Sequence, residues 1–403
     1  MTATAEALLI GLSEAAATVA VDLTADGRIT VAAACGTRAT VLRRTFDGAP
    51  DTSFGERGTV FTAPADAGFT TLAPTGLAVG ADGAPTVIAT ADDQVAVLRY
   101  TPDSALDPSF ADRGIALAAP GADPSPVDVA LTAAGGVVVA VNITVDGKPR
   151  IAVLRFTPAG APDPAFGDRG IAFVELNEDA QAVAIDLHGD GAVVLAGTAT
   201  RTTAAQPELL LAQFTPGGDP DPAFGSGGVA LHQPAGTLAT GLAMSLDGGR
   251  NIVLAGTSKD RFLAARYTST GEPDPSFGDR GAATGVLLTD AAATTVGVRA
   301  DGSAVVAGTT GSGWAAVRFT PDGSPDTGFG NRGAAVGSFT GGTGTAADQV
   351  AGIVLSAAGD IVIAGTATDR IALVSLTANG APSPVFGRSG HRRPLQPGCR
   401  EQG

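Results

Sequence analysis

The feature that most constrains the fold of this chain is a short motif that recurs seven times. The motif has the form Asp-(Pro or Thr)-x-Phe-Gly-x-x-Gly, with single changes in some copies. Its phenylalanines are Phe54, Phe110, Phe166, Phe224, Phe277, Phe329 and Phe386. Successive copies are 52 to 58 residues apart, and together they span almost all of the 403 residues. So regular a period indicates an array of similar structural units instead of unrelated domains.

Each unit has the pattern of β-structure. Residues 183–187 alternate between apolar and polar side chains, and an Asp-Gly pair typical of a tight hairpin follows. A branched run such as 193–197 comes next, and segments like 151–156 and 171–174 lie on either side of the phenylalanine motif. Four antiparallel strands per unit, repeated seven times, predict an all-β, seven-bladed β-propeller. No segment has a convincing 3.6-residue period, so we expect almost no helix.

The repeat resembles the delta-60 repeat family of bacterial propeller-like proteins. The match is best at residues 301–308 and 316–333, which follow the family pattern from its Asp-Gly turn through Arg-Phe to Phe-Gly-x-x-Gly. It recurs seven times over roughly residues 18 to 390. The resemblance implies a propeller fold and no particular reaction. Members are often exported, whereas no signal peptide is visible in this sequence.

The two ends of the sequence predict how the ring closes. Residues 8–12 have the pattern of a fourth strand with no unit before them. After Gly390 the expected fourth strand is absent, and Pro394 and Pro397 discourage a sheet there. We therefore expect residues 1–13 to complete the last blade and close the ring. Residues 1–390 would form one domain, and residues 391–403 a disordered tail.

Composition excludes several classes of function. The chain has 25 basic and 40 acidic side chains, a formal net charge of −15, which argues against nucleic-acid binding. No uninterrupted apolar stretch is long enough to span a membrane. Two cysteines at opposite ends form no disulfide framework. The arginine, glycine and alanine bias indicates a GC-rich bacterial genome. We expect a cytoplasmic monomer.

Repetition separates residues of the scaffold from candidates for a site. In five units an arginine ends the third strand, and an aspartate follows eight positions later; the arginines are Arg43, Arg99, Arg155, Arg266 and Arg318. A second arginine lies in the phenylalanine motif of the same five units, at Arg57, Arg113, Arg169, Arg280 and Arg332. We interpret both sets as an ion-pair network that braces the turns. The alternative is a repeated anion site.

Irregular residues gather in the loops of one face, named the top face here because the innermost strands begin there. Ligand or partner binding is therefore expected at the top mouth of a central channel. If the protein is an enzyme, the candidate acid-base residues are His232, Glu178, Asp179 and Asp128. The candidate ligand-binding residues are Trp314, Arg261, Asp348 and Asn142. Trp314 has a second interpretation, as a core residue packed between blades.

Signatures of known catalytic and metal sites are absent from the sequence. It contains no His-Glu-x-x-His, no Cys-x-x-Cys and no Gly-x-Ser-x-Gly. Asp22 and Asp186 occupy equivalent positions on innermost strands, where they would either share a cation or bond to neighbouring backbone. We expect no cofactor and no metal. Three functions remain: a propeller that binds a small molecule or protein, a hydrolase, lyase or cyclase without a redox cofactor, and a structural scaffold.

Overall fold

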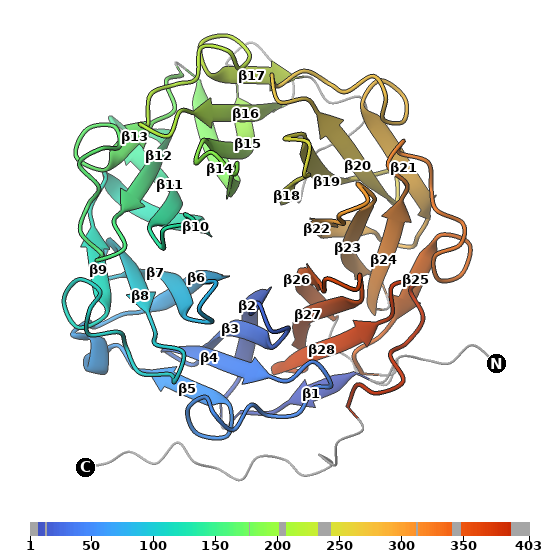
Figure 1. Cartoon of the computed structure of the whole chain (residues 1–403), viewed down its shortest axis with the longest axis horizontal. Coiled ribbons are helices and arrows are strands. Elements are labelled where there is room, and N and C mark those ends of the chain that lie inside the picture. Colours follow the sequence, from blue (N-terminus) through green and yellow to red (C-terminus); the bar gives the residue numbers. More distant parts are fainter. Residues whose placement is uncertain are drawn as a thin grey trace.

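The computed structural model is a ring of seven four-stranded sheets, seen along its axis in Figure 1. It describes residues 7–12, 14–176, 178–200, 207–232, 243–311, 313–340 and 348–387. Within each sheet, neighbouring strands are antiparallel and follow one another in the sequence, apart from the sheet that joins the two ends of the chain. The predicted seven-bladed β-propeller is confirmed.

The blades are numbered from the first complete repeat, and each runs from the innermost to the outermost strand. Blade one contains β2 (Ala16–Leu23), β3 (Ile29–Cys35), β4 (Arg38–Arg44) and β5 (Thr59–Thr62). Blade two contains β6 (Ala73–Val79), β7 (Pro85–Ala91), β8 (Gln94–Arg99) and β9 (Ile115–Ala118). Blade three contains β10 (Ala122–Leu131), β11 (Val137–Val145), β12 (Lys148–Phe156) and β13 (Ile171–Phe173).

The remaining blades repeat this order. Blade four contains β14 (Asp179–Leu187), β15 (Val193–Thr200), β16 (Glu208–Phe214) and β17 (Val229–His232). Blade five contains β18 (Ala243–Leu246), β19 (Ile252–Ser258), β20 (Arg261–Tyr267) and β21 (Ala282–Leu287). Blade six contains β22 (Ala292–Val298), β23 (Ala304–Thr310), β24 (Gly313–Phe319) and β25 (Ala334–Gly337). Blade seven contains β26 (Gln349–Leu355), β27 (Ile361–Ala367), β28 (Arg370–Leu376) and β1 (Leu8–Ile10).

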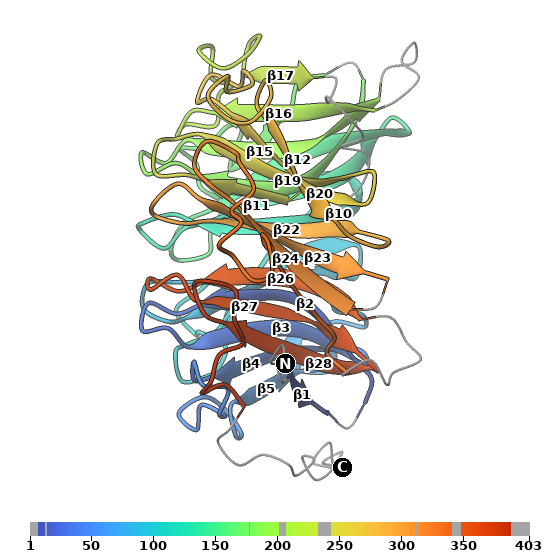
Figure 2. The same ribbon diagram turned by 90° about the vertical axis from the view of Figure 1, so that its right-hand side faces the viewer.

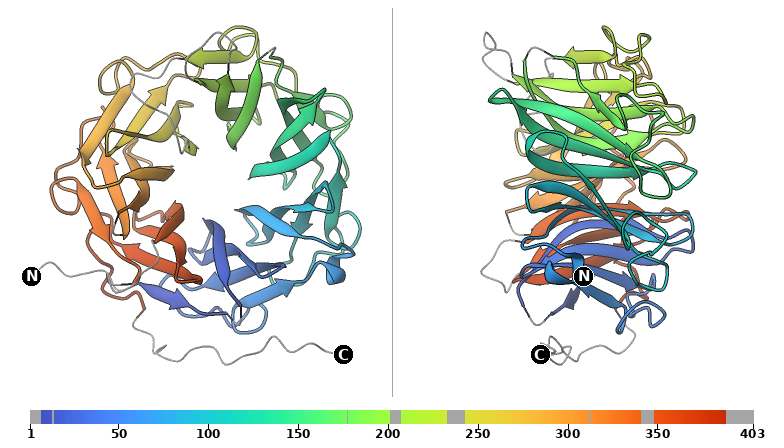
Figure 3. Two further views of the ribbon diagram at one scale, coloured as in Figure 1. Left: turned by 180° about the vertical axis from the view of Figure 1, so that it is seen from behind. Right: turned by 90° about the vertical axis from the view of Figure 1, so that its left-hand side faces the viewer.

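The N-terminal strand β1 closes the ring, as the sequence predicts. It pairs antiparallel with β28, and Leu9 lies opposite Ala372. Seen from behind in Figure 3, the blue first strand lies beside the red strands of the last blade. Ile10 is buried in a cluster with Leu373 and Phe386, where Leu8 also packs. Both ends of the described chain therefore build one sheet. Residues 391–403, for which a disordered tail is predicted, lie outside the described residues.

The core lies between the faces of adjacent blades. Seven clusters of buried valine, leucine, isoleucine and alanine each combine residues of neighbouring sheets. The motif phenylalanine is buried in every blade, between 0% and 4% exposed. Figure 2 shows the flat disc edge-on, with the strands running between its two faces. Small and branched side chains suit this arrangement because each layer between two sheets is thin.

Threonine hydroxyls on the second strand join each of three blades to the next. The Thr366 hydroxyl accepts a hydrogen bond from the Thr18 backbone N–H at 2.8 Å, across the junction that closes the ring. At the same position of other blades, Thr257 accepts from the Ala293 N–H at 2.8 Å, and Thr309 accepts from the Val350 N–H at 3.1 Å. The second strand of one blade thus holds the edge of the next blade's innermost strand.

The described residues contain one helical element, the 3-10 turn η1 (Ala65–Ala67) in the loop between blades one and two. This agrees with the expectation of almost no helix. Among the residues that the structure describes, no helix has the length and apolarity needed to cross a membrane.

Candidate functional site

The innermost strands carry acidic and no basic side chains. Over β2, β6, β10, β14, β18, β22 and β26, as bounded above, the charged residues are Asp22, Asp123, Asp128, Asp179 and Asp186. Their top ends are accessible to solvent, since Asp123, Ser125, Asp179, Gln181 and Gln349 are all exposed. The charged side chains of the innermost strands are therefore all acidic within the described bounds.

Three of these aspartates join innermost strands of neighbouring blades. The Asp22 carboxylate accepts hydrogen bonds from its own neighbour Leu23 N–H and from Val79 N–H of blade two, both at 2.7 Å. Asp128 likewise accepts from Val129 N–H and from Ile185 N–H of blade four, both at 2.9 Å. Edge N–H groups that no strand pairs are satisfied in this way.

These bridging carboxyls titrate abnormally. Burial raises the pKa of Asp128 to about 7, because removing the charge from water outweighs the hydrogen bonds from Ile185 and Val129, and the nearby Asp186 carboxylate raises it further. Burial also raises the pKa of Asp22 to about 6, against the hydrogen bonds from Val79 and Leu23. The pKa of Asp186 is raised for the same reason. Asp128 is thus a carboxyl that exchanges protons near neutral pH.

The raised pKa of Asp128 predicts a pH-dependent stability. Between about pH 4 and pH 7 the folded protein keeps a proton that the unfolded chain releases, so a rising pH lowers the free energy of unfolding. In Asp128→Asn this contribution is absent. We expect the stability of the wild type relative to the variant to fall by about 4 kcal/mol over that interval. Urea unfolding of both proteins at several pH values measures it.

The exposed Asp123 on the same strand provides the matched control. Asp123→Asn should leave the pH dependence of unfolding as it is in the wild type. A difference between wild type and Asp128→Asn that stays constant from pH 4 to pH 8 would show that Asp128 is ionised throughout.

The structure does not bring the four candidate acid-base residues together. Asp128 lies within the innermost strand β10, below the top rim where the sequence placed it. His232 lies on β17, the outermost strand of blade four, far from the ring's axis in Figure 1. Its Nε2 is 2.7 Å from the Gly271 carbonyl oxygen, and its ring packs 5.1 Å from that of Tyr267. His232 therefore does not line the channel mouth, and its contacts join blades four and five.

Glu178 and Asp179 do lie at the top end of blade four. Asp179 begins β14 and is exposed, and Glu178 precedes it. Arg150 donates a hydrogen bond to the Glu178 carbonyl oxygen at 2.9 Å, and its guanidinium is 4.0 Å from the Asp179 carboxylate. We call these two residues, together with Asp123, the acidic rim of the top face.

Two of the predicted ligand-binding residues belong to the scaffold. Trp314 is 1% exposed and packs in the core between blades six and seven, opposite Gly337 on β25. Its place in the core corrects the ligand-binding prediction and agrees with the alternative interpretation. Arg261 begins β20 and donates to the Gly285 carbonyl oxygen at 2.8 Å. Neither side chain lies on an innermost strand.

The other two ligand-binding candidates also bond to backbone. Asp348 is buried, and it accepts a hydrogen bond from the Phe339 N–H at 2.6 Å. The Asn142 amide accepts from the Ala182 N–H at 2.7 Å and donates to the Ala182 carbonyl oxygen at 3.1 Å. Asn142 is the blade-three counterpart of the threonines that bridge blades. The sequence contains one signal for this bridging role: threonine occupies the position equivalent to Asn142 in most blades.

Asp22 and Asp186 bond to backbone, the second of the two interpretations offered for them. Asp186 accepts from the Leu187 N–H at 2.8 Å and from the backbone of Leu246 in blade five. In the described ranges no group of three or more histidine, cysteine, aspartate or glutamate side chains is placed to hold a metal ion.

Four of the five arginines that end the third strands form the predicted network. Arg43, Arg155 and Arg266 each donate from Nε to the aspartate eight positions later at 2.7 Å, as does Arg318. Each guanidinium also lies 4.4 to 5.0 Å from the ring centre of its own motif phenylalanine. In blade four Gln213 takes the place of arginine and donates to Asp221 at 2.6 Å. The four arginines brace the turns as expected.

The second set of arginines does not join that network. The side chains of Arg113, Arg169 and Arg280 are 85%, 89% and 88% exposed, and each is 3.3 to 3.7 Å from the aspartate before it. Their backbones have φ between 51° and 52°, a left-handed conformation that suits glycine, and glycine stands at this position in blade four. For these three arginines the expected network that braces the turns is wrong, because among the described residues each pairs only with the exposed aspartate next to it.

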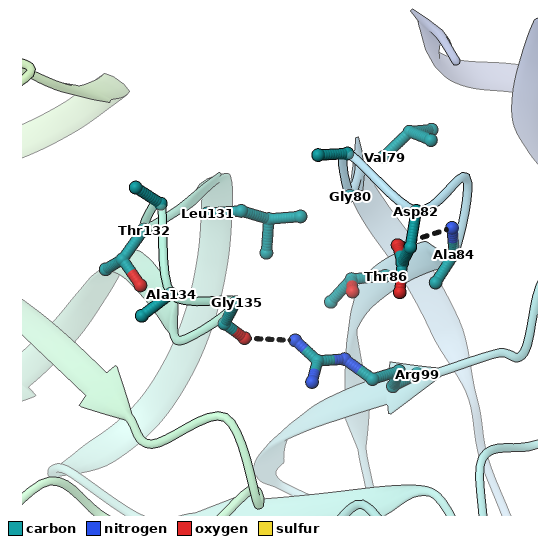
Figure 4. A pocket seen from close by; sticks show the side chains of 12 residues that line it. Val79, Gly80, Asp82, Ala84, Thr86, Arg99, Leu131, Thr132, Ala134 and Gly135 are labelled. Atoms are coloured by element: carbon teal, nitrogen blue, oxygen red, sulfur yellow. Dashed lines mark hydrogen bonds between the residues drawn. The ribbon is translucent and has the colours of Figure 1, made fainter. Parts of the chain in front are cut away.

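Arg99 of blade two departs from the pattern of its four counterparts. In the described structure it makes no hydrogen bond to Asp107, the aspartate eight positions later; instead it donates to the Pro158 carbonyl oxygen at 2.8 Å and to that of Gly135. It borders a cleft of about 420 Å³ on the bottom face, between blades two and three (Figure 4). Burial lowers the pKa of Arg99, and Asp107 and Asp82 act in the opposite direction. The sequence predicts Arg99 in the same ion-pair network as its counterparts, and the bond to Asp107 that this requires does not form in the described structure.

Comparison with known proteins agrees with the repeat architecture. Residues 135–166, 188–224, 251–277 and 299–329 match a family model described as a domain of unknown function (DUF5122) beta-propeller. These four segments are similar to the repeats of that β-propeller family. No curated protein matches the sequence.

Several solved structures have the same fold. A catalytically inactive virginiamycin B lyase from Staphylococcus aureus, with quinupristin, is 14% identical with a TM-score of 0.54, over 91% of this chain and 98% of that one. Drosophila semaphorin 2a is 10% identical with a TM-score of 0.56, over 94% and 76%. Prolyl oligopeptidase B from Galerina marginata is 11% identical with a TM-score of 0.50, over 90% and 49%. Similarity at this level of identity shows the fold alone.

Proposed function

We propose that this protein is a binding propeller that takes up a cationic ligand, or a cationic group of a protein partner, at the top mouth of its central channel. The observation that carries this proposal is the charge of the innermost strands, which have five aspartates and no basic residue within their described bounds. Asp123 and Asp179 are exposed where their strands begin. Their negative potential attracts a positive group and repels an anion.

The arrangement of the acid-base residues favours binding over catalysis. A general acid and a general base act on one substrate only when both are within hydrogen-bonding reach of it. His232 is on an outermost strand, whereas Asp128 and Asp179 are on innermost strands. The width of a blade therefore separates His232 from Asp128 and Asp179.

The test uses spermidine as a cationic probe and triethylene glycol as a neutral one. Calorimetric titration of the full chain should show saturable binding of spermidine and none of triethylene glycol. The double variant Asp123→Asn, Asp179→Asn should bind spermidine about tenfold more weakly, because each exposed ion pair contributes up to about 1 kcal/mol. Asp219→Asn with Asp322→Asn, on the bottom-face turns, is the matched control. Equal loss in both double variants would show only a non-specific attraction to an acidic protein.

One observation favours the alternative, an enzyme without a redox cofactor. The pKa of Asp128 is raised to about 7 by burial, which suits a single acid-base group that works at neutral pH. The carboxyl faces an inner strand edge that a substrate in the channel would approach. For any substrate found, loss of turnover with retained binding in Asp128→Asn would favour this alternative over a binding function.

A further inference from the structure

The cleft between blades two and three lies on the bottom face, opposite the acidic rim. Its lining combines the turn after β6 and the turn after β10 with the ends of β7 and β8. Four polar side chains line it, Asp82, Thr86, Arg99 and Thr132, among the apolar groups of residues such as Leu131. The volume of about 420 Å³ is that of a site for a small molecule.

Arg99 has hydrogen-bonding capacity that its counterparts lack. In blades one, three, five and six the arginine Nε donates to an aspartate at 2.7 Å. The described structure shows no such bond from Arg99 Nε, and its two recorded bonds use only Nη1 and Nη2. A guanidinium with a free Nε edge binds a carboxylate through two parallel hydrogen bonds. Asp107 accepts hydrogen bonds from the backbone N–H and hydroxyl of Ser109 at 2.9 and 2.7 Å, as Asp51 and Asp274 do from their serines, but in the described structure it accepts none from its arginine.

Thr86 provides a second, independent observation. It lies opposite Arg99 in the β7–β8 pairing, is 0% exposed, and its hydroxyl has no hydrogen-bond partner in the described structure. Blades three to seven have valine at this position: Val138, Val194, Val253, Val305 and Val362. An unpaired buried hydroxyl costs about 1 to 3 kcal/mol, and valine has the same shape without that cost. Figure 4 shows Thr86 between Asp82 and Arg99, beneath the same space.

Asp82 narrows the class of ligand. Its carboxylate lies on the same side of the cleft as Arg99, and one of its oxygens accepts the Ala84 N–H at 3.0 Å. A ligand that carries only negative charge is repelled by this group. A ligand with both a carboxylate and an ammonium group satisfies Arg99 and Asp82 together, and it has no net charge to be repelled by an acidic protein.

We propose that the cleft binds a small aminocarboxylate, such as a free amino acid, with Arg99 and Thr86 holding the carboxylate and Asp82 holding the ammonium group. The apolar wall formed by Val79, Leu131 and Ala134 receives its side chain. This site is separate from the top mouth, so the result of its test does not depend on the proposed function.

Three probes of one shape distinguish the parts of the site: L-leucine, 4-methylpentanoate with the carboxylate alone, and 3-methylbutylamine with the ammonium alone. Calorimetric titration of the full chain should show leucine binding with a dissociation constant of about 1 mM or lower, and either partial probe binding at least about tenfold more weakly. Arg99→Gln should abolish binding of leucine. Absence of saturable leucine binding up to about 10 mM, or equal binding of 4-methylpentanoate, overturns the assignment.

Threonine variants separate a binding role from a structural one. Blade one has the equivalent Thr30, also buried without a partner for its hydroxyl, but there Arg43 is bonded to Asp51. Thr86→Val and Thr30→Val should therefore raise the melting temperature alike. Only Thr86→Val should weaken leucine binding, by roughly fivefold for the loss of one hydrogen bond. Equal leucine affinity in both variants would show that Thr86 takes no part. Asp82→Asn should remove the preference for leucine over 4-methylpentanoate.

Discussion

Deleting residues 1 to 13 is expected to lower the melting temperature by several degrees and to promote aggregation. The deletion removes β1, and with it the buried side chain of Ile10 and the partly buried Leu8 and Leu9. Their apolar surface contributes about 4 kcal/mol. The deletion also leaves β28 as an unpaired edge strand, which can pair with another chain. Scanning calorimetry and light scattering measure the two effects.

Two comparisons control this experiment. Deleting residues 391 to 403 should change neither the melting temperature nor the scattering, because the ring is closed without them. Ile10→Asp keeps the strand but places a carboxylate in the cluster with Leu373 and Phe386, so it should destabilise by a similar amount. If the protein that lacks residues 1 to 13 melts at the same temperature as the full-length chain, β1 is dispensable.

Arg266→Ala is expected to lower the free energy of unfolding by about 3 kcal/mol. The guanidinium donates to Asp274 and to the Pro321 carbonyl oxygen, both at 2.7 Å, and the latter bond reaches the next blade. Burial alone would raise the pKa of Asp274, but hydrogen bonds from Ser276 and Arg266 outweigh it and lower the pKa. Without Arg266 the buried carboxylate loses its partner. Urea unfolding monitored by fluorescence or circular dichroism measures the loss.

Arg280 of the same blade is the matched control. Its side chain is 88% exposed and lies 3.7 Å from Asp279, so Arg280→Ala should change stability by less than about 0.5 kcal/mol. If the two variants unfold at the same urea concentration, the network around Arg266 contributes nothing to the fold.

The architecture could be predicted from the sequence because its signals are local and repeated. The motif phenylalanine, the Asp-Gly turns and the alternating segments each act within one blade, and seven copies make a chance pattern untenable. Ring closure could be predicted as well, since residues 8–12 match a strand that blade seven lacks. These inferences needed no knowledge of distances between blades.

The candidate site could not be predicted equally well, because it depends on which blade a residue faces. The sequence predicts His232 at the channel mouth, but in the structure it ends β17, the outermost strand of its blade. The free edge of Arg99 is also invisible in the sequence, where Arg99 and Asp107 have the same spacing as the pairs that do form. Thr86 stands where five blades have valine, but blade one has Thr30 at the same position, so this residue alone does not identify the cleft.

The placement of β1 and β28 in one sheet makes this array different from an open solenoid. An open array has two end repeats, each with a single neighbour, and can lose structure from either end inwards. Here blade one packs on blade seven through the Thr18–Thr366 hydrogen bond and a shared apolar cluster, so every blade has two neighbours. Separation of the three residue pairs between β1 and β28 converts the closed ring into an open array. Blades one and seven then become end repeats, from which structure can be lost inwards.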